Sequence, residues 1–592
     1  MAWVQTTKIP PNRRLEFTLR DFSGGLNNRS TVIEDNEASD LRNMAFLTND
    51  VMEKRHGYKK YDDLILDDAI THVNLYRPYT EEDELIRATN REVYANGRKI
   101  ADVQGEIDSV NYQGQFFFCD GEDLFVYGKH PSKTGTYLEI IGTRPNEAVT
   151  LKVVNPPEGY EPLPKEHAEG KLVYNYDEMT VHYEPCLNEL DDVYMNANVI
   201  PEHPRFIVVH KDRLYISGDK KDDDNVFISH NSQPFYFPSA LPIQLPPNSD
   251  EVRGLVVYDD NVIVGRRHDI YRITGEALNP ELGFELFQLR KINTHTGFAS
   301  HKAIDVAHSH LFFMGHDGTA YAMTTVRMDE RLLSTQIISQ QLDLFKDPIG
   351  ITQDDLMNSA SVFDGEYWYV NVGDLTLVYS YRHRAWTVYD TIDMNAPFYY
   401  FDKIIWGRKD GVLAEFSEDY LDDGRPIYAY WQSKALDFDE PSRYKQFREF
   451  YLAAQAYAGS TSDIRVTFEV DYADVYGSAY VANMIAIWGK SKFGDRFISR
   501  NINASIPFMI GRRARNLRIR FANSVPILDE VDTEDDLFDV KRKRNYNGAY
   551  VRETGGYYYY LSGEWIRLTE EEINQPMLVY EVNGEYDMKG KR

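Results

Sequence analysis

Short aromatic or β-branched runs alternate with tight polar turns along most of the chain. In three clear cases an Asp-Gly turn joins two such runs: Phe116–Cys119 to Leu124–Tyr127, Leu311–Met314 to Thr319–Met323, and Ile404–Gly407 to Val412–Phe416. Apolar runs bounded by Asp, Asn and Gly are typical of antiparallel strands joined by hairpins. The pattern therefore predicts consecutive β-hairpins from about residue 62 to residue 432.

These hairpins recur as seven units. We place them at residues 71–103, 107–141, 205–245, 251–290, 302–340, 357–390 and 397–432. Recurrence every roughly 35–55 residues is typical of radial or stacked arrays, and such steps suit four-stranded blades with loops. The predicted fold class is all-β, with a β-propeller of about six to eight blades. A β-solenoid is the alternative, although its repeats are usually shorter and more uniform.

Three further segments flank or interrupt the repeats. Residues 142–200 separate the second unit from the third and predict an inserted small β-subdomain or an extended arm. Residues 433–528 hold longer alternating runs such as Leu517–Phe521, which predict a β-sandwich or jelly-roll-like domain. Residues 529–592 read as an acidic hinge followed by a tail hairpin that docks only on a partner.

Residues 1–61 are irregular and polar, with one helix candidate. Apolar residues at helical spacing predict a short helix over Glu37–Leu47, with Asp35-Asn36 as its cap. A segment this polar is not expected to form a core of its own. We therefore expect an extended assembly arm that crosses a neighbouring subunit and orders on assembly.

Composition narrows the function. Aromatic residues reach 13%, with 42 Tyr and 30 Phe, which favours strands. The net charge of −28 excludes a general binder of DNA or of acidic membranes. The two cysteines, Cys119 and Cys186, form no disulfide framework. No apolar leader or membrane-spanning stretch is apparent, so a soluble protein made in a reducing cytoplasm is expected.

Candidate chemistry is sparse. The acidic run Asp219–Asn225 suggests a calcium loop but lacks the ligand spacing, so a solvated hairpin tip is favoured. His308 and His310 suggest zinc, yet they share a strand face without a third ligand in register. Neither a phosphate-binding loop nor a Gly-x-Ser-x-Gly elbow occurs. We predict no catalytic residue, no metal and no cofactor.

Arginine clusters at Arg512, Arg513 and Arg515, which is the strongest local basic feature. Such a patch could pair with an acidic neighbour or contact DNA. In so acidic a chain we favour the first, because complementary charges fix the register between subunits.

Conspicuous short motifs lie in the N-terminal segment: Phe22-Ser23-Gly24-Gly25-Leu26-Asn27, Asn36-Glu37-Ala38, Leu41-Arg42-Asn43 and Lys54-Arg55-His56-Gly57-Tyr58. In this order they resemble the entry segment of tail-nozzle or tail-hub propeller proteins of tailed bacteriophages, the tail tubular protein B class. Val226–Phe237 and Trp431–Phe438 resemble later passages of that family.

The resemblance implies an oligomeric ring in a phage tail, and six copies are expected as in that family. Its partners would be further copies, other tail or connector proteins, viral DNA passing through the lumen without sequence-specific binding, and the host surface at ejection. The assembly-arm residues would be Phe22, Gly24, Gly25, Asn27, Asn36, Glu37, Asn43, Arg55 and Gly57.

The function predicted is thus a structural virion protein, without enzyme activity, that channels and gates DNA. The alternatives are a propeller that binds or hydrolyses glycans and a tail-tip receptor binder. A glycan hydrolase requires a carboxylate pocket on the propeller axis.

Overall fold

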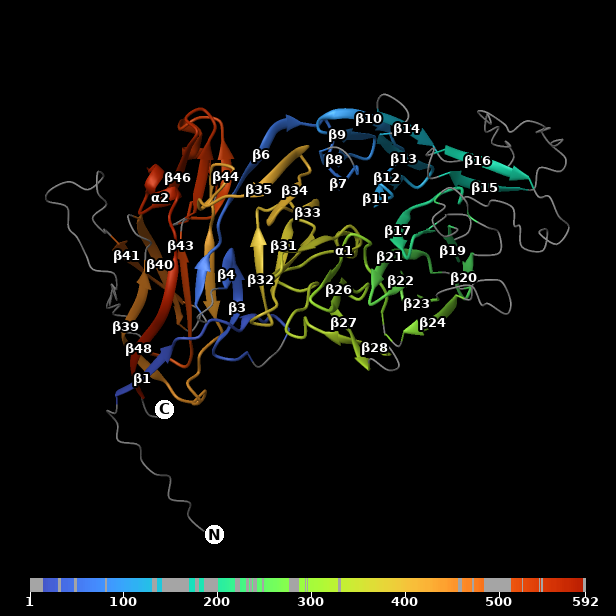
Figure 1. Ribbon diagram of the computed structural model, residues 1–592. Helices are drawn as coiled ribbons and strands as arrows, with labels where there is room; N and C mark the ends of the chain where they lie inside the picture. Colours follow the sequence, from blue (N-terminus) through green and yellow to red (C-terminus); the bar gives the residue numbers. More distant parts are fainter. Residues whose placement is uncertain are drawn as a thin grey trace, which may run out of the picture.

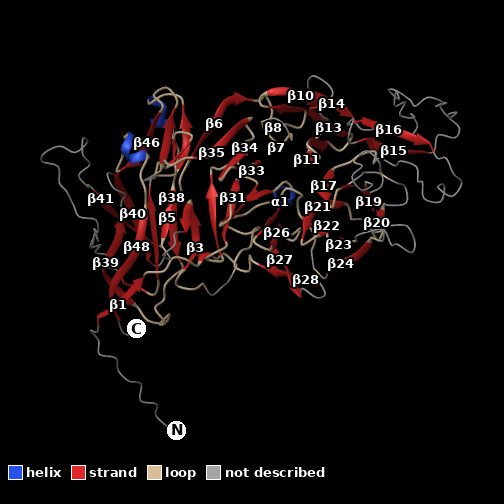
Figure 2. Ribbon diagram, viewed as in Figure 1, coloured by secondary structure: helices blue, strands red, loops and turns tan. Residues whose placement is uncertain are grey.

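The computed structural model describes an all-β chain (Figures 1 and 2). It describes residues 14–588 except for 30–32, 47–50, 80–81, 130–135, 141–169, 176–179, 186–200, 219–223, 230–233, 235–236, 238–241, 248–249, 276–286, 293, 295, 328–331, 456–459, 471–472, 484–512, 524, 542 and 545–546. In these residues the helical elements are α1 (Gln353–Met357), α2 (Glu570–Ile573) and the 3-10 helix η2 (Asp535–Asp539). None of the described helices is long and apolar enough to cross a membrane.

Seven small sheets follow one another along the middle of the chain, and each of the first six is a four-stranded antiparallel meander. Their strands are β7 (His72–Tyr76), β8 (Glu84–Ala88), β9 (Glu92–Ala95) and β10 (Arg98–Asp102); β11 (Asp108–Tyr112), β12 (Gln115–Cys119), β13 (Leu124–Lys129) and β14 (Thr136–Ile140); β17 (Phe206–His210), β18 (Arg213–Ser217), β19 (Asn225–Ile228) and β20 (Ile243–Gln244); β21 (Val252–Tyr258), β22 (Asn261–Arg266), β23 (Ile270–Thr274) and β24 (Gln288–Ile292); β25 (Ile304–Ala307), β26 (His310–Met314), β27 (Ala320–Arg327) and β28 (Leu332–Ile337); β29 (Ala360–Phe363), β30 (Tyr367–Val372), β31 (Leu375–Ser380) and β32 (Ala385–Asp390).

The seventh sheet takes a strand from much earlier in the chain. Its own hairpins are β33 (Ala396–Tyr400), β34 (Lys403–Gly407), β35 (Val412–Phe416), β36 (Leu421–Asp422) and β37 (Arg425–Pro426). Strand β6 (Tyr58–Ile65) lies between β35 and β36, antiparallel to β35. The seventh sheet is therefore completed by residues that precede the first, and β33 also contacts β7 of that first sheet.

Continuous apolar runs form the second strands because these are covered on both faces. Along β12, Phe116 and Phe118 pack in a core cluster shared with the first sheet, whereas Phe117 packs in a cluster shared with the third. The hairpin turns follow the predicted chemistry. Asp120 Oδ1 accepts the backbone N–H groups of Glu122 and Asp123, and Gly121 adopts φ 87°. The first six predicted units thus each match one sheet, whereas the seventh, 397–432, differs: its sheet also contains residues 58–65, and residues 429–433 pair in another sheet.

Two larger sheets pack face to face beside the seventh sheet, and we call them the two-sheet unit. One has the order β4-β5-β48-β39-β42, with β1 on β48, and the other β2-β3-β38-β43-β40-β41. Phe450 and Phe468, from opposite sheets, lie with ring centroids 4.5 Å apart. The strands are β1 (Arg14–Leu19), β2 (Gly25–Leu26), β3 (Glu37–Arg42), β4 (Met44–Phe46), β5 (Met52–Lys54), β38 (Ala429–Ser433), β39 (Lys445–Gln455), β40 (Ser460–Val470), β41 (Ala473–Asn483), β42 (Arg513–Ala514), β43 (Leu517–Asn523) and β48 (Leu578–Met588).

The remaining strands form two further sheets. The first consists of β44 (Ile527–Val531), β45 (Gly548–Val551), β46 (Gly556–Leu561) and β47 (Glu564–Arg567), at the upper left of Figure 1. The second is the hairpin β15 (Gly170–Asn175) and β16 (Thr180–Pro185) within the predicted insertion. The rest of residues 142–200 lies outside the described residues.

The helix predicted over Glu37–Leu47 is wrong. Residues 37–42 form β3 and 44–46 form β4, separated by Asn43 at φ 54°. A bulge between Ala38 and Asp40 shifts the register of β3 on β38, so buried residues fall in pairs rather than alternating. Those pairs imitate helical spacing.

The N-terminal segment also differs from the expected arm. Its strands β1–β5 belong to the chain's own two-sheet unit, and Phe22 is fully buried there. Strand β48 lies between β39 and β5 in one of these sheets, so residues 578–588 are not a tail that waits for a partner. The domain boundaries predicted at 61, 433 and 529 therefore divide a unit whose strands come from both ends of the chain.

Candidate functional site

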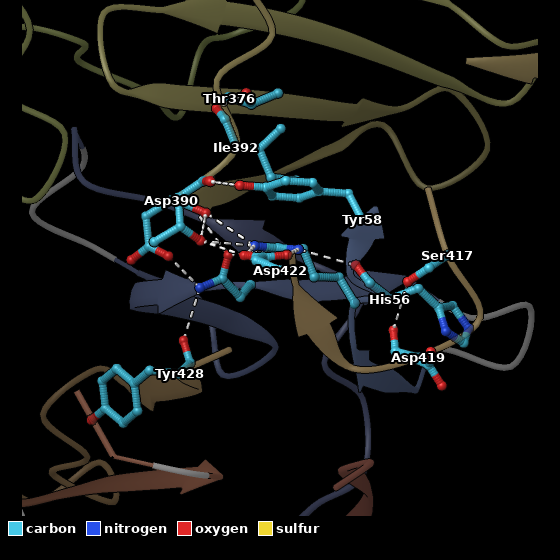
Figure 3. A network of polar contacts seen from close by, with 12 residues as sticks. His56, Tyr58, Thr376, Asp390, Ile392, Ser417, Asp419, Asp422 and Tyr428 are labelled. Atoms are coloured by element: carbon cyan, nitrogen blue, oxygen red, sulfur yellow. Dashed lines mark hydrogen bonds and ion pairs between the residues drawn. The ribbon is translucent and has the colours of Figure 1, made fainter. Parts of the chain in front are cut away.

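Arg55 is the centre of a buried polar network where the two-sheet unit meets the sixth and seventh sheets (Figure 3). Its side chain is 2% exposed and forms a bidentate ion pair with Asp422, with N···O distances of 2.8 and 2.6 Å. Its Nε donates to Asn43 Oδ1 at 2.8 Å. A paired, hydrogen-bonded guanidinium of this kind holds its partners in one geometry.

The network reaches five separate places in the sequence. Arg55 Nη2 donates to the Asp390 carbonyl at the end of β32, at 3.0 Å. Asn43 Nδ2 donates to the Asp390 carboxylate and, at 2.8 Å, to the Tyr428 carbonyl just before β38. Figure 3 shows Asp390, Asp422 and Tyr428 converging on this point. The network thus ties β3, β5, β32, β36 and β38 together.

Two charged side chains, Arg55 and Lys54, are buried next to each other at this junction. Burial lowers the pKa of Arg55, but the ion pair with Asp422 outweighs it, so the pKa lies above its ordinary value. Its neighbour Lys54 is fully buried, and burial together with the Arg55 charge lowers the pKa of Lys54 to about 7. Lys54 Nζ donates to Asn523 Oδ1 at 2.9 Å and to the Gln575 carbonyl at 3.0 Å.

The earlier motif residues make a second set of contacts. Phe22 packs edge-on against Trp431 and Phe521, with centroids 5.1 and 5.6 Å away. Asn27 Nδ2 donates to Glu37 Oε2 at 2.7 Å, and the other Glu37 oxygen accepts from Gln341 at 3.1 Å.

The motif glycines allow close approaches of backbone. A side chain on Gly25, which has φ 69°, would meet the Trp386 backbone of β32. A side chain on Gly24 would meet the backbone of Asn36, whose Nδ2 donates to Asp21 at 3.1 Å. A side chain on Gly57 would overlap the Leu421 carbonyl of β36.

The nine predicted assembly-arm residues therefore make contacts inside the chain, but not all at one place. Asn43, Arg55 and Gly57 lie at the junction with β32 and β36. Phe22, Gly25 and Glu37 contact Trp431, Trp386 and Gln341, whereas Gly24, Asn27 and Asn36 contact residues of their own segment. The junction partners Asp390 and Asp422 were missed by the sequence analysis. Both occur in acidic turns that look like the chain's other solvated turns, so the sequence carries no signal that separates them.

The predicted basic patch is only partly described. Arg513 and Arg515 are exposed on either side of the buried Ala514, whereas Arg512 lies outside the described residues. Arg518 instead pairs with Glu469 at 2.9 Å, and Arg520 lies over the Tyr430 ring at 3.8 Å.

A second candidate site is a cavity of about 860 Å³ between the seven small sheets. Every first strand of these sheets contributes to its wall. The contributing residues are His72, Asp108, Phe206, Arg253, Ile304, Ser361 and Pro397. Residues next to α1, such as Asn358, line it as well.

The charged groups of this cavity are held by one another. His301 Nε2 lies 3.0 Å from Asp108 Oδ2, which also accepts the Ile207 N–H at 2.8 Å. Burial raises the pKa of Asp108, but His301 and the Ile207 N–H outweigh it, so the pKa lies below its ordinary value. Lys302 pairs with Glu106.

Asp108 is therefore kept ionised and paired. Behind the cavity wall, burial raises the pKa of Asp305 to about 6, and its carboxylate accepts from the lining residue Ser361. Burial lowers the pKa of His72 to about 4, so this imidazole stays neutral near pH 7.

The zinc and calcium sites that the sequence suggested fall only partly within the described residues. Among the described residues no group of three His, Cys, Asp or Glu side chains is placed to hold a metal ion. His308 lies 2.6 Å from the Gly365 carbonyl and stacks on Tyr381. Most of the acidic run, residues 219–223, lies outside the described part, as does Cys186.

Comparison with known proteins gives no family. No family model matches the chain, and no curated protein matches it either. Among solved structures, the extracellular domain of a protein described as a one-component system from B. thetaiotaomicron is 10% identical with a TM-score of 0.34. The match covers 87% of this chain and 60% of that chain.

A second solved structure, described as a 6-phosphogluconolactonase from Bacteroides uniformis, is also 10% identical, with a TM-score of 0.29. That match covers 62% of this chain and 93% of the other. At these scores neither structure assigns a function to this chain.

Proposed function

We propose that this chain is a structural subunit of a bacteriophage tail, where copies form a nozzle or hub ring through which DNA passes. The observation that carries the proposal is the buried Arg55 junction. It uses Asn43 and Arg55 from the motifs that resemble the tail-protein entry segment, and it fastens the small sheets to the two-sheet unit. A wall under mechanical load needs such a joint.

The fold we propose for residues 58–426 is a closed seven-bladed β-propeller. Three observations support closure: all seven first strands line one cavity, β33 contacts β7, and β6 supplies the fourth strand of the last sheet, after β33, β34 and β35. Closure by an earlier strand leaves no open end in the array. The two-sheet unit would then be a β-sandwich fixed to the sixth and seventh blades.

In the proposed ring the subunit acts mechanically and not as a catalyst. The net charge of −28 would let DNA slide past without adhering, since like charges repel. The ionised, internally paired Asp108 supports a structural role for the axial cavity. Whether residues 142–200 gate the lumen or bind a neighbour stays a prediction.

Electron microscopy and native mass spectrometry of the purified chain test this proposal. A closed ring, expected with six copies, supports it. A monomer at all concentrations that hydrolyses cell-surface glycans would overturn it in favour of the enzyme alternative. A monomer that binds host cell wall without turnover would favour the receptor-binding alternative.

A further inference from the structure

An open groove runs along the edge strand β44 of the sheet β44–β47. It has a volume of about 450 Å³ and is lined by Leu528, Asp529, Glu530, Val531, Asp536, Asp539, Val540 and Lys541. Beside it, Leu528 is 43% exposed and Phe538, on η2, is 73% exposed. Large apolar side chains this exposed next to an unpaired strand edge are typical of interaction surfaces. We call this surface the β44 groove.

Among the described residues that line the β44 groove, four are carboxylates and one, Lys541, is a cation. Lys543 and Arg544 follow shortly after Lys541 in the sequence. Glu530 is 3.3 Å from Arg552, and Asp536 accepts from Thr533 at 2.9 and 2.8 Å. By contrast, Asp529 Oδ2 is buried without a hydrogen-bond partner among the described residues.

A basic surface lies elsewhere on the same chain. Arg513 in β42 and Arg515 just after it are exposed, and β42 is the last strand in the described order of its sheet. The Arg515 guanidinium also lies over the Tyr444 ring, 5.1 Å from its centroid. The fully buried Lys445 fixes their backbone, because its Nζ donates to the Arg515 carbonyl at 2.8 Å and to the Glu440 carbonyl at 2.7 Å. Guanidinium groups on a rigid segment suit carboxylates, which they bind in a bidentate manner.

The two surfaces lie at opposite ends of β43, so they cannot meet within one chain. Arg515 precedes β43 and β44 follows it. A strand of this length separates them by roughly 20 Å, about two screening lengths at 0.1 M salt. A contact between two different faces of identical chains runs head to tail, and such contacts close into rings when the rotation permits.

We propose that the β44 groove of one copy receives the Arg513–Arg515 surface of a second copy. This deepens the proposed function, on which it rests, because it assigns the contact that joins neighbouring subunits of the ring. DNA is a poor occupant of so acidic a groove.

A charge swap tests the contact. Arg513→Glu with Arg515→Glu, and separately Glu530→Lys with Asp539→Lys, should each weaken assembly at least about tenfold, since close interfacial charge pairs contribute at least about 1.5 kcal/mol. Combining both pairs in one chain should restore assembly. Matched controls are Lys60→Glu and Glu564→Lys, exposed reversals outside both surfaces. Circular dichroism and melting confirm that each variant folds, and Asp539→Asn gives a milder variant.

The outcomes separate this inference from the proposed function. Loss in each single swap and recovery in the combined swap support it. Rings that persist in both swaps, or losses that the combined swap does not repair, overturn the contact but leave the proposed ring intact. A wild-type chain that stays monomeric at all concentrations overturns both.

Discussion

At the scale of single residues, the molecule depends on polar groups that are buried in pairs. A buried ion pair adds little net stability compared with apolar packing, but removing one partner leaves a desolvated charge behind. The side chains of Arg55 and Asp422 are 2% and 4% exposed. Their role is therefore best tested by breaking the pair one side at a time.

Arg55→Met should lower the free energy of unfolding by about 3–5 kcal/mol, because Asp422 would remain buried without its partner. Urea denaturation measures the change. The matched control is Arg552→Met, which removes an exposed pair with Glu530 and Asp532 and should change the free energy of unfolding far less, because water and salt screen exposed ion pairs. Equal effects of the two substitutions would contradict the assigned role of the junction.

Asp305 should make stability depend on pH. Burial raises the pKa of Asp305 to about 6, although its carboxylate accepts from Ser361 and, at 2.8 Å, from Trp368 Nε1. Because the folded pKa lies above the unfolded one, this group stabilises the fold fully below about pH 4 and loses that contribution as pH rises through 6.

The difference in unfolding free energy between wild type and Asp305→Asn, measured from pH 4 to pH 8, should therefore shift in favour of the variant as pH rises. A difference that stays flat over this range would show that Asp305 titrates normally.

At the scale of elements, the sequence was informative wherever neighbouring strands are also neighbours in the chain. Each of the first six sheets is a local meander, so alternation and turn residues such as Asp120 and Gly121 were enough to place it. The strand β6 could not be assigned to the seventh sheet, because its partner β35 is far away in the sequence. The bulge in β3 likewise gave this strand the spacing of buried residues that is typical of a helix, so the sequence predicted a helix there.

The contacts of the candidate site were equally hard to predict, because they too join residues that are distant in the sequence. Motif residues such as Asn43 and Arg55 were identified, but their location was not, since polarity was taken to mean that the segment has no core. The polar groups are instead buried against one another and against Asp390 and Asp422. Long-range pairing of this kind leaves no local pattern.

Gly57 tests how closely β6 must approach β36. In Gly57→Ala the added methyl group would overlap the Leu421 carbonyl, and the Gly57 N–H would lose its 2.6 Å hydrogen bond to Asp419 if the backbone moved. We expect a loss of about 2–3 kcal/mol from this overpacking. The control, Gly555→Ala, meets no atom within 4 Å and strains only φ 59°, so it should cost about 1–2 kcal/mol. Thermal melts of both variants provide the comparison.

At the scale of the whole molecule, the small sheets and the two-sheet unit are joined too closely to unfold apart. The N-terminal strands contact β32 and also pair with β38 and β48. The wild type should therefore unfold in one calorimetric transition, whereas Arg55→Met should separate it into two. Two transitions in the wild type would show that the junction does not couple the parts.

The central position of β48 also has a consequence for biosynthesis. Met52 pairs with Val579, so a sheet begun by early strands of this sequence is finished by a strand that is synthesised much later. At roughly 5–20 residues per second, the early strands wait roughly 30–100 s for their partner. During that interval their open edges need protection, for example by a chaperone. A prematurely terminated chain would keep those edges open, and this offers the cell a way to withhold incomplete copies from assembly.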